Sequence, residues 1–279
     1  MKKLVLLFAA LITITGSSIA QVNSKHQDNP PATVYVQNQI NTERASGCTF
    51  LVFMDNLPWG SSAIQDILTA NGETFSVETS SMMATENFEL FDVIIIASDQ
   101  VPAFYVDFAA NFTKFVSFVT NGGSLEVHAA TCGWNSPCGY SVVLPGGTYT
   151  TEQYDWTDNV VDFAHPITAG LPNPFSGTYA SHGYFSGLVG GTDIITETAS
   201  NNLPTTIQYK YGPGVVTATT CTYEFGYLYG QDPGTMLVNN LNYSCQHHID
   251  ANTPISDWAI GIGIFLILMA AFVRYKRLI

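Results

Sequence analysis

Short apolar runs alternate with longer amphipathic segments from about residue 48 of this 279-residue chain onward. The apolar runs predict strands at residues 49–54, 91–97 and 124–130, and a further strand is predicted at residues 73–78. The amphipathic segments predict helices, at residues 61–70 and 104–120. Apolar strands separated by helices indicate a parallel sheet with helices on both faces, so the pattern favours a flavodoxin-like α/β fold.

The pattern changes after Cys132, where Gly, Pro and Tyr become frequent and loops are predicted. A hairpin is then expected from residues 205–211 and 215–220, around Gly212-Pro213-Gly214. A short helix at about residues 233–241 closes the predicted domain, which spans residues 48–246.

The N-terminal segment has the layout of a secretory signal peptide at residues 1–20. Lys2 and Lys3 precede an apolar run, and small residues up to Ala20 follow it. We expect cleavage after Ala20 and an extended lead-in at residues 21–47. The chain is therefore predicted to be exported, with its domain in the cell envelope or on the cell surface.

The C-terminal segment predicts a membrane helix. Residues 258–273 carry no charge and are followed by a basic tail at residues 274–279, which is expected to stay in the cytoplasm. The spacer at residues 247–257 ends in the motif Pro254-Ile255-Ser256-Asp257. This arrangement resembles bacterial C-terminal sorting signals, which implies a sorting protease or exosortase-type enzyme as partner. A retained single-pass anchor and a processed one both remain open.

Charge excludes one class of partner. The net charge is −13, and only four basic residues lie between the two ends, at Lys25, Arg44, Lys114 and Lys210. A nucleic-acid-binding protein needs a cationic surface that displaces counterions from phosphates. The composition therefore argues against a nucleic-acid partner.

Four segments resemble proteins related to the trehalose-utilisation protein ThuA, within the class I glutamine amidotransferase-like superfamily. The segments are Gly122 to Thr131, His165 to Pro172, Ser181 to Phe185 and Gly212 to Val216. The resemblance covers about residues 48–243 and implies the same flavodoxin-like fold.

An amidotransferase also needs a cysteine nucleophile, a histidine and a glutamate. Cys132 and Glu224 fall near the expected places, but Thr222 stands where the family has its histidine. The sequence therefore predicts no amidotransferase activity.

Five cysteines in an exported chain suggest disulfides. Cys132 and Cys138 lie six residues apart, and we expect them to pair, although a reactive Cys132 thiol is the alternative. Cys221 and Cys245 are a plausible second pair, which would leave Cys48 over.

Ligands of open α/β sheets bind outside the carboxyl ends of the strands. The candidate ligand-binding residues are therefore Asp55, Asn56, Trp59, Asp99, Gln100, Trp134, His182 and Tyr184. Candidate acid, base or nucleophile residues are Asp99, His128, Cys132, His182 and Glu224. Trp59, Trp134, Tyr179 and Tyr184 are candidates for a platform under sugar rings, with core or rim packing as the alternative.

No His-x-x-x-His or His-x-His spacing is present, so neither a metal site nor a cofactor is predicted. The favoured interpretation is a surface-displayed binding or interaction module for carbohydrate or another surface ligand. The first alternative is a carbohydrate-active hydrolase or lyase, and the second is a structural adhesin or matrix component.

Overall fold

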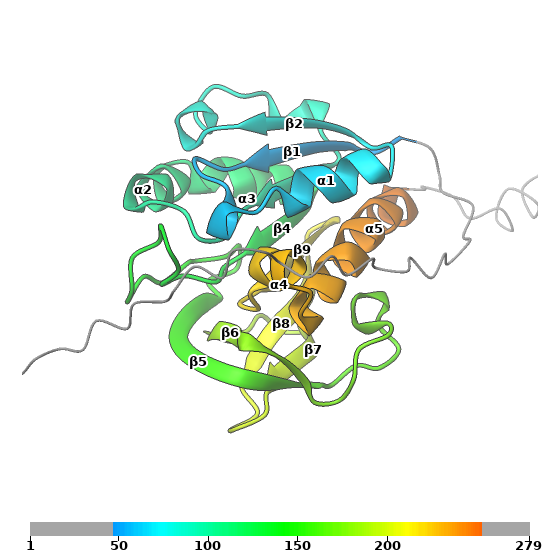
Figure 1. Ribbon diagram of the computed structural model, residues 1–279. Helices are drawn as coiled ribbons and strands as arrows, with labels where there is room; N and C mark the ends of the chain where they lie inside the picture. The colour runs from blue at the N-terminus through cyan, green and yellow to red at the C-terminus, as the bar shows by residue number, and fades with distance from the viewer. Residues whose placement is uncertain (1–46, 253–279) are drawn as a thin grey trace, which may run out of the picture. The chain divides into compact units, whose positions relative to one another are not determined.

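The computed structural model describes residues 47–252, with side chains as far as Cys245. The strands in this part form one sheet in the order β2-β1-β3-β4-β9-β8-β7-β5-β6 (Figure 1). They are β1 (Thr49–Phe53), β2 (Thr74–Glu78), β3 (Val93–Ile96), β4 (Ser124–His128), β5 (Tyr149–Val160), β6 (Phe175–Ser186), β7 (Asp193–Thr198), β8 (Pro204–Tyr211) and β9 (Gly214–Thr219). The α-helices are α1 (Ala63–Ala70), α2 (Pro102–Ala110), α3 (Phe112–Thr120), α4 (Tyr223–Tyr229) and α5 (Asp232–Asn252).

The strands β2, β1, β3, β4 and β9 are mutually parallel and form what we call the parallel region. Taken in chain order, their arrangement is the 2-1-3-4-5 order of flavodoxin-like sheets. The predicted flavodoxin-like fold is therefore confirmed for these five strands.

Helices cover both faces of the parallel region, as Figure 1 shows. Phe50 and Val52 of β1 pack with α1, α4 and α5, whereas Leu51 and Phe53 pack with α2 and α3. This division follows from the strand geometry, because successive side chains point to opposite faces of a sheet. Both faces of β1 and β3 are apolar, which explains why these two strands are visible in the sequence as continuous apolar runs.

The antiparallel region consists of β8, β7, β5 and β6. Here the sequence prediction was incomplete: the hairpin of β8 and β9 was expected, but β5, β6 and β7 fall where loops were predicted. In β5, threonine and aromatic residues alternate with acids and amides, and much of the strand is partly or fully exposed. The strand therefore lacks the apolar run by which a buried strand is recognised. The sheet is mixed rather than purely parallel.

The helix predictions also needed correction. The helix expected at residues 104–120 is divided into α2 and α3 at Asn111, whose backbone is not helical. The Asn111 side-chain amide donates to the Asp107 carbonyl oxygen, so it competes with the helical backbone bonds. The last helix, α5, runs beyond the expected end to Asn252, and α4 was not predicted.

Two disulfides are present in the described part of the chain. Cys132 pairs with Cys138, as the sequence favoured, and Cys48 pairs with Cys245. The expected Cys221–Cys245 pairing is wrong, since Cys221 is free and buried. Helix α5 crosses the sheet near the start of β1, which brings Cys245 next to a cysteine 197 residues earlier.

The predicted signal peptide, lead-in, membrane helix and basic tail lie largely or wholly outside residues 47–252. Among the described helices, none is both long enough and apolar enough to cross a bilayer. The expectations for the two ends therefore stay predictions.

Candidate functional site

Two of the candidate acid–base residues meet in the core. His128, at the end of β4, lies between two carboxylates: its Nδ1 is 2.6 Å from Glu224 Oε1, and its Nε2 is 2.6 Å from Glu126 Oε1. The Ser98 hydroxyl donates a hydrogen bond to the Glu224 carboxylate, and the Asn240 amide and Ser244 hydroxyl donate hydrogen bonds to the Glu126 carboxylate. We call these six residues the buried network.

The buried network is charged but closed to solvent. Burial alone would lower the pKa of His128, but the carboxylates of Glu224 and Glu126 outweigh it and raise the pKa to about 10. Burial likewise opposes ionisation of Glu224, yet the neighbouring imidazolium lowers its pKa. The His128 and Glu224 side chains have no exposed surface. The network therefore holds β4, α4 and α5 together and cannot contact a ligand at the surface.

Asp99 follows β3 and is fully buried. Its two carboxylate oxygens accept hydrogen bonds from the backbone of Trp59, Asn135 and Ser136, and from the side chains of Asn135 and Ser136. Gly133 is needed here, because a Cβ atom would collide with the Asp99 carboxylate. Asp99 therefore ties together the two loops at residues 57–60 and 132–138.

Gln100 and Asp55 also fix loops. The Gln100 side chain accepts from the backbone of Asp55 and Asn56 and donates to the carbonyl oxygens of Asn56 and Ser98. Asp55 accepts from the Ser80 backbone and hydroxyl. Of these three predicted ligand residues, only Asn56 is well exposed.

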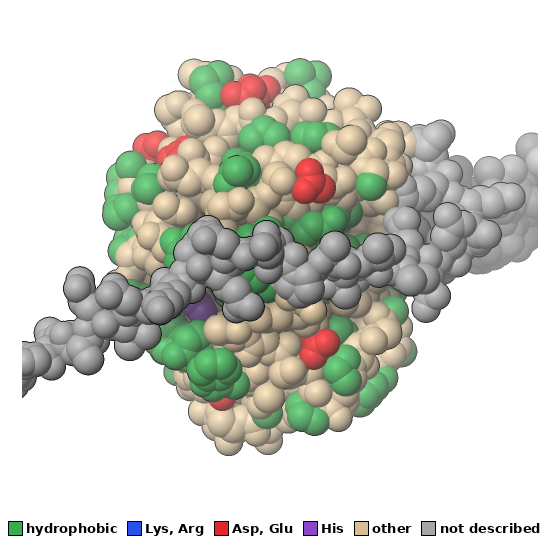
Figure 2. All heavy atoms as spheres, in the orientation of Figure 1, with side chains coloured by type: hydrophobic (Ala, Val, Ile, Leu, Met, Phe, Trp, Pro, Cys, Tyr) green, Lys and Arg blue, Asp and Glu red, His purple; other side chains and the backbone are tan. Residues whose placement is uncertain are grey.

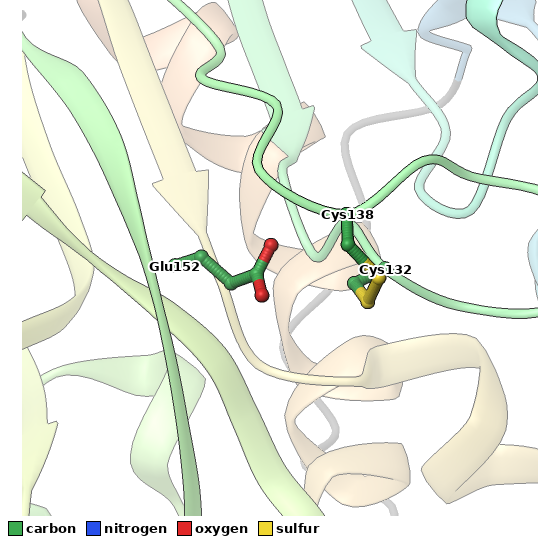
Figure 3. Close-up of side chains that lie close together, drawn as sticks. All are labelled: Cys132, Cys138 and Glu152. Carbon is green, nitrogen blue, oxygen red and sulfur yellow. A yellow bond between two sulfur atoms is a disulfide. The ribbon is translucent and has the colours of Figure 1, made fainter. Parts of the chain in front are cut away.

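The Cys132–Cys138 disulfide lies beside Glu152, as Figure 3 shows. Cys138 is exposed, Cys132 has a left-handed backbone (φ 58°), and their sulfur atoms lie within 4.8 Å of a Glu152 carboxylate oxygen. Two thiolates and a carboxylate are a possible metal-ligand set. With the sulfur atoms bonded to each other, however, neither is a thiolate, so the set does not suit a metal in this state.

Aromatic side chains gather at the edge of the sheet, close to the carboxyl ends of the parallel strands. We define the aromatic platform as Tyr154 and Trp156 of β5 together with Tyr179 and His182 of β6. The Tyr179 ring centroid is 4.6 Å from that of Trp156 and 5.5 Å from that of Tyr154. The Tyr154 and His182 centroids are 5.1 Å apart. Adjacent antiparallel strands therefore bring four rings into contact with one another.

The three outer rings of the platform are exposed to solvent. The exposed fraction is 57% for Trp156, 40% for Tyr154 and 38% for Tyr179. In the view of Figure 2, hydrophobic side chains gather at the lower left beside a histidine. Tyr179 also has a left-handed backbone (φ 58°), which costs free energy in a bulky residue.

His182 lies at the inner margin of the platform. Its Nδ1 is 2.8 Å from the Thr131 carbonyl oxygen, to which a neutral ring donates. Burial lowers the pKa of His182, so the imidazole is neutral near pH 7. From His182 a second row of rings continues through Trp59 and Phe225 to the exposed Trp134.

The predicted site residues therefore separate into distinct places. His128 and Glu224 meet in the core, and Asp99 lies between loops. Trp134, Tyr179 and His182 are the sequence candidates that reach the platform or its continuation, and Trp59 belongs to that continuation as a buried ring. Within residues 47–252, Tyr184 makes no ring contact with the platform, and it is only partly exposed on β6.

Three residues at this surface were missed. Glu152, Tyr154 and Trp156 occupy alternate positions of β5, which was predicted as loop. The alternation of side chains along 149–160, with Tyr and Trp among polar residues, was the signal that could have identified them.

No family model matches the chain. An uncharacterized protein of Clostridium acetobutylicum is 30% identical over 197 residues, which cover 70% of this chain and 20% of that protein. This chain therefore spans about a fifth of the length of the curated relative that it matches.

Similar solved structures share little sequence with the chain. A cytoplasmic protein from Salmonella typhimurium matches 70% of this chain and 98% of its own, with a TM-score of 0.47 and 14% identity. A glutamine amidotransferase from Thermotoga maritima matches 73% of this chain and 95% of its own, with a TM-score of 0.45 and 8% identity. The flavodoxin-like assignment rests on the strand order of the parallel region itself.

Proposed function

We propose that the protein is a carbohydrate-binding module that uses the aromatic platform and has no amidotransferase activity. The observation that carries this proposal is the exposure of Tyr154, Trp156 and Tyr179 in mutual contact. Water solvates aromatic faces poorly, and contiguous exposed apolar surface is typical of binding sites. The C–H faces of a sugar ring are flat and apolar, so they complement such a surface.

The polar neighbours of the platform suit the same ligand. A sugar presents hydroxyl groups around its apolar faces, and these need donors and acceptors at the margin of the stacking surface. The phenol of Tyr154 donates to Glu152 Oε1 at 2.6 Å and retains acceptor capacity. The platform thus combines stacking with hydrogen bonding.

The exposure of the aromatic platform and the burial of the candidate acid and base residues favour binding over catalysis. An amidotransferase needs a free cysteine thiolate and a histidine base, but Cys132 is in a disulfide and Thr222 donates to the Tyr179 carbonyl oxygen. A carbohydrate hydrolase needs acid and base side chains that reach the substrate. Asp99, His128 and Glu224 are buried and engaged by protein groups, so they are poor candidates for that role.

The proposed function includes a family relationship and a cellular location. We propose a ThuA-like relationship, export through residues 1–20, and surface display with the segment at 258–273 as an anchor or sorting signal. Disulfides form in oxidising compartments, and the two present here support export. A sorting enzyme would then be a partner at the C-terminal motif.

A glycan array probed with the purified chain tests the binding proposal. We expect the wild-type chain to bind one or a few classes of glycan on the array. The Trp156→Ala, Tyr179→Ala double variant should bind the same glycans much more weakly. Phe163→Ala is the matched control, because Phe163 is an exposed aromatic residue (68%) outside the platform. An array without specific binding, or equal loss in both variants, would contradict the proposal.

A further inference from the structure

One carboxylate lies beside the aromatic platform. Glu152 precedes Tyr154 and Trp156 on β5 at two-residue spacing, and it accepts the Tyr154 hydroxyl bond. It also accepts a hydrogen bond from the Gly139 backbone amide. These two bonds lower the pKa of Glu152, with the Gly139 bond contributing most, so the side chain is ionised at neutral pH.

Positive charge is scarce around this carboxylate. In the described part of the chain the lysine and arginine side chains are Lys114 and Lys210, and the charged His128 is enclosed in the buried network. Lys114 is occupied elsewhere, because its ammonium donates to the carbonyl oxygens of Met83, Ala84 and Glu86. Lys210 belongs to the β8–β9 hairpin, and Figure 2 shows no lysine or arginine on the face that it displays.

Charge therefore distinguishes between kinds of glycan. A uronic acid or a sulfated sugar would bring a second anion close to Glu152 without a cation to pair with it. A free sugar amine would bring an ammonium group, which the carboxylate can accept in a charge-assisted hydrogen bond. Exposed aromatic faces also attract cations, because the ring quadrupole is negative above and below the ring.

We propose that the aromatic platform prefers glycans that carry free amines, with Glu152 receiving the ammonium group of a sugar stacked on Tyr154 and its neighbours. This inference rests on the proposed carbohydrate-binding function and names its ligand class. Tyr154 is hydrogen bonded directly to Glu152, so a sugar that stacks on this ring places its substituents next to the carboxylate.

A matched pair of oligosaccharides tests the preference for free amines separately from carbohydrate binding itself. Glucosamine hexamer and N-acetylglucosamine hexamer share one backbone and differ in whether the nitrogen is a charged amine or a neutral amide. We expect the purified chain to bind the glucosamine hexamer about tenfold more tightly at low ionic strength, with the preference reduced by added salt. Glu152→Gln should bring the ratio of the two dissociation constants close to one.

Glu89→Gln is the control, since it removes the same charge from an exposed position in another part of the chain and should leave the ratio unchanged. Unfolding midpoints of both variants near the wild-type value show that the fold is kept. If the N-acetylated hexamer binds as tightly as the amine form, or if both substitutions change the ratio equally, the amine preference is wrong while carbohydrate binding stands. If neither hexamer binds and the array is also negative, the proposed function itself fails.

Discussion

His128 and His182 lie in the same sheet but in opposite surroundings. His128 is enclosed by two carboxylates and has lost contact with water. His182 is next to Tyr154 and Tyr179, whose rings reach the solvent. The charged residues most suggestive of catalysis therefore stabilise the fold, whereas the exposed side chains next to His182 are mainly aromatic.

The two disulfides repeat this contrast. Cys48–Cys245 is buried and joins the start of β1 to α5 across 197 residues, whereas Cys132–Cys138 lies at the surface and closes a loop six residues apart. A cross-link that closes a long loop restricts the unfolded chain more than one that closes a short loop.

The largest predicted effect is therefore on the buried disulfide. Replacing Cys48 and Cys245 by alanine should lower the free energy of unfolding by about 5 kcal/mol, against about 2 kcal/mol for Cys132 and Cys138. Urea unfolding of the two double variants measures the difference. A larger decrease in unfolding free energy on removal of the Cys132–Cys138 disulfide would contradict this prediction.

The next prediction concerns the histidines themselves. His128→Gln leaves two buried carboxylates without their cation and should cost about 3–5 kcal/mol of unfolding free energy. His182→Gln removes one hydrogen bond from a neutral ring to the Thr131 carbonyl oxygen and should cost about 1 kcal/mol. Equal losses in the two variants, again from urea unfolding, would show that His128 is not the centre of a charged network.

The buried network also predicts a dependence on pH. The folded-state pKa of His128, about 10, lies above its unfolded value of about 6.5. Its contribution to stability is therefore complete below about pH 6.5 and is lost as the pH rises toward 10. Thermal unfolding between pH 6.5 and 10 should show a steady fall for the wild-type chain and a flatter profile for His128→Gln. Parallel profiles would contradict this origin of the pH dependence.

The smallest predicted effect on stability accompanies a large effect on binding. Trp156 is mostly exposed, so Trp156→Ala should change the free energy of unfolding by less than about 0.5 kcal/mol. Loss of a central aromatic contact should nevertheless weaken glycan binding roughly ten- to a hundredfold. Thermal unfolding and titration with the array-selected glycan check the two halves of this prediction. A destabilised variant would instead assign Trp156 to the fold.

The sequence predicted the central strands of the parallel region well because β1, β3 and β4 are buried on both faces, whereas the edge strand β2 is largely exposed. The apolar runs at 49–54 and 91–97 correspond closely to β1 and β3. It predicted the antiparallel region poorly because β5 leaves its aromatic side chains at the surface among polar ones, so no apolar run marks the strand. Buried strands were therefore recognised from the sequence, whereas the long, partly exposed strand β5 was not.

The candidate site was also predicted only in part. The residue types at the strand ends were correctly noticed, but burial decides their role and depends on how distant segments pack. Nothing local to Glu224 shows that it lies against His128, 96 residues earlier, with Ser98 on its other oxygen. The Cys48–Cys245 bond was missed for the same reason, since the path of α5 across the sheet is a tertiary property.

Calorimetric titration of the best-binding glycan, with mass spectrometry of the recovered oligosaccharide, distinguishes a binding module from an enzyme. We predict saturable one-site binding to the wild-type chain, much weaker binding to Trp156→Ala, and an oligosaccharide recovered unchanged. Equal binding by the two proteins, or cleavage products in the recovered material, would contradict a binding module built on the aromatic platform.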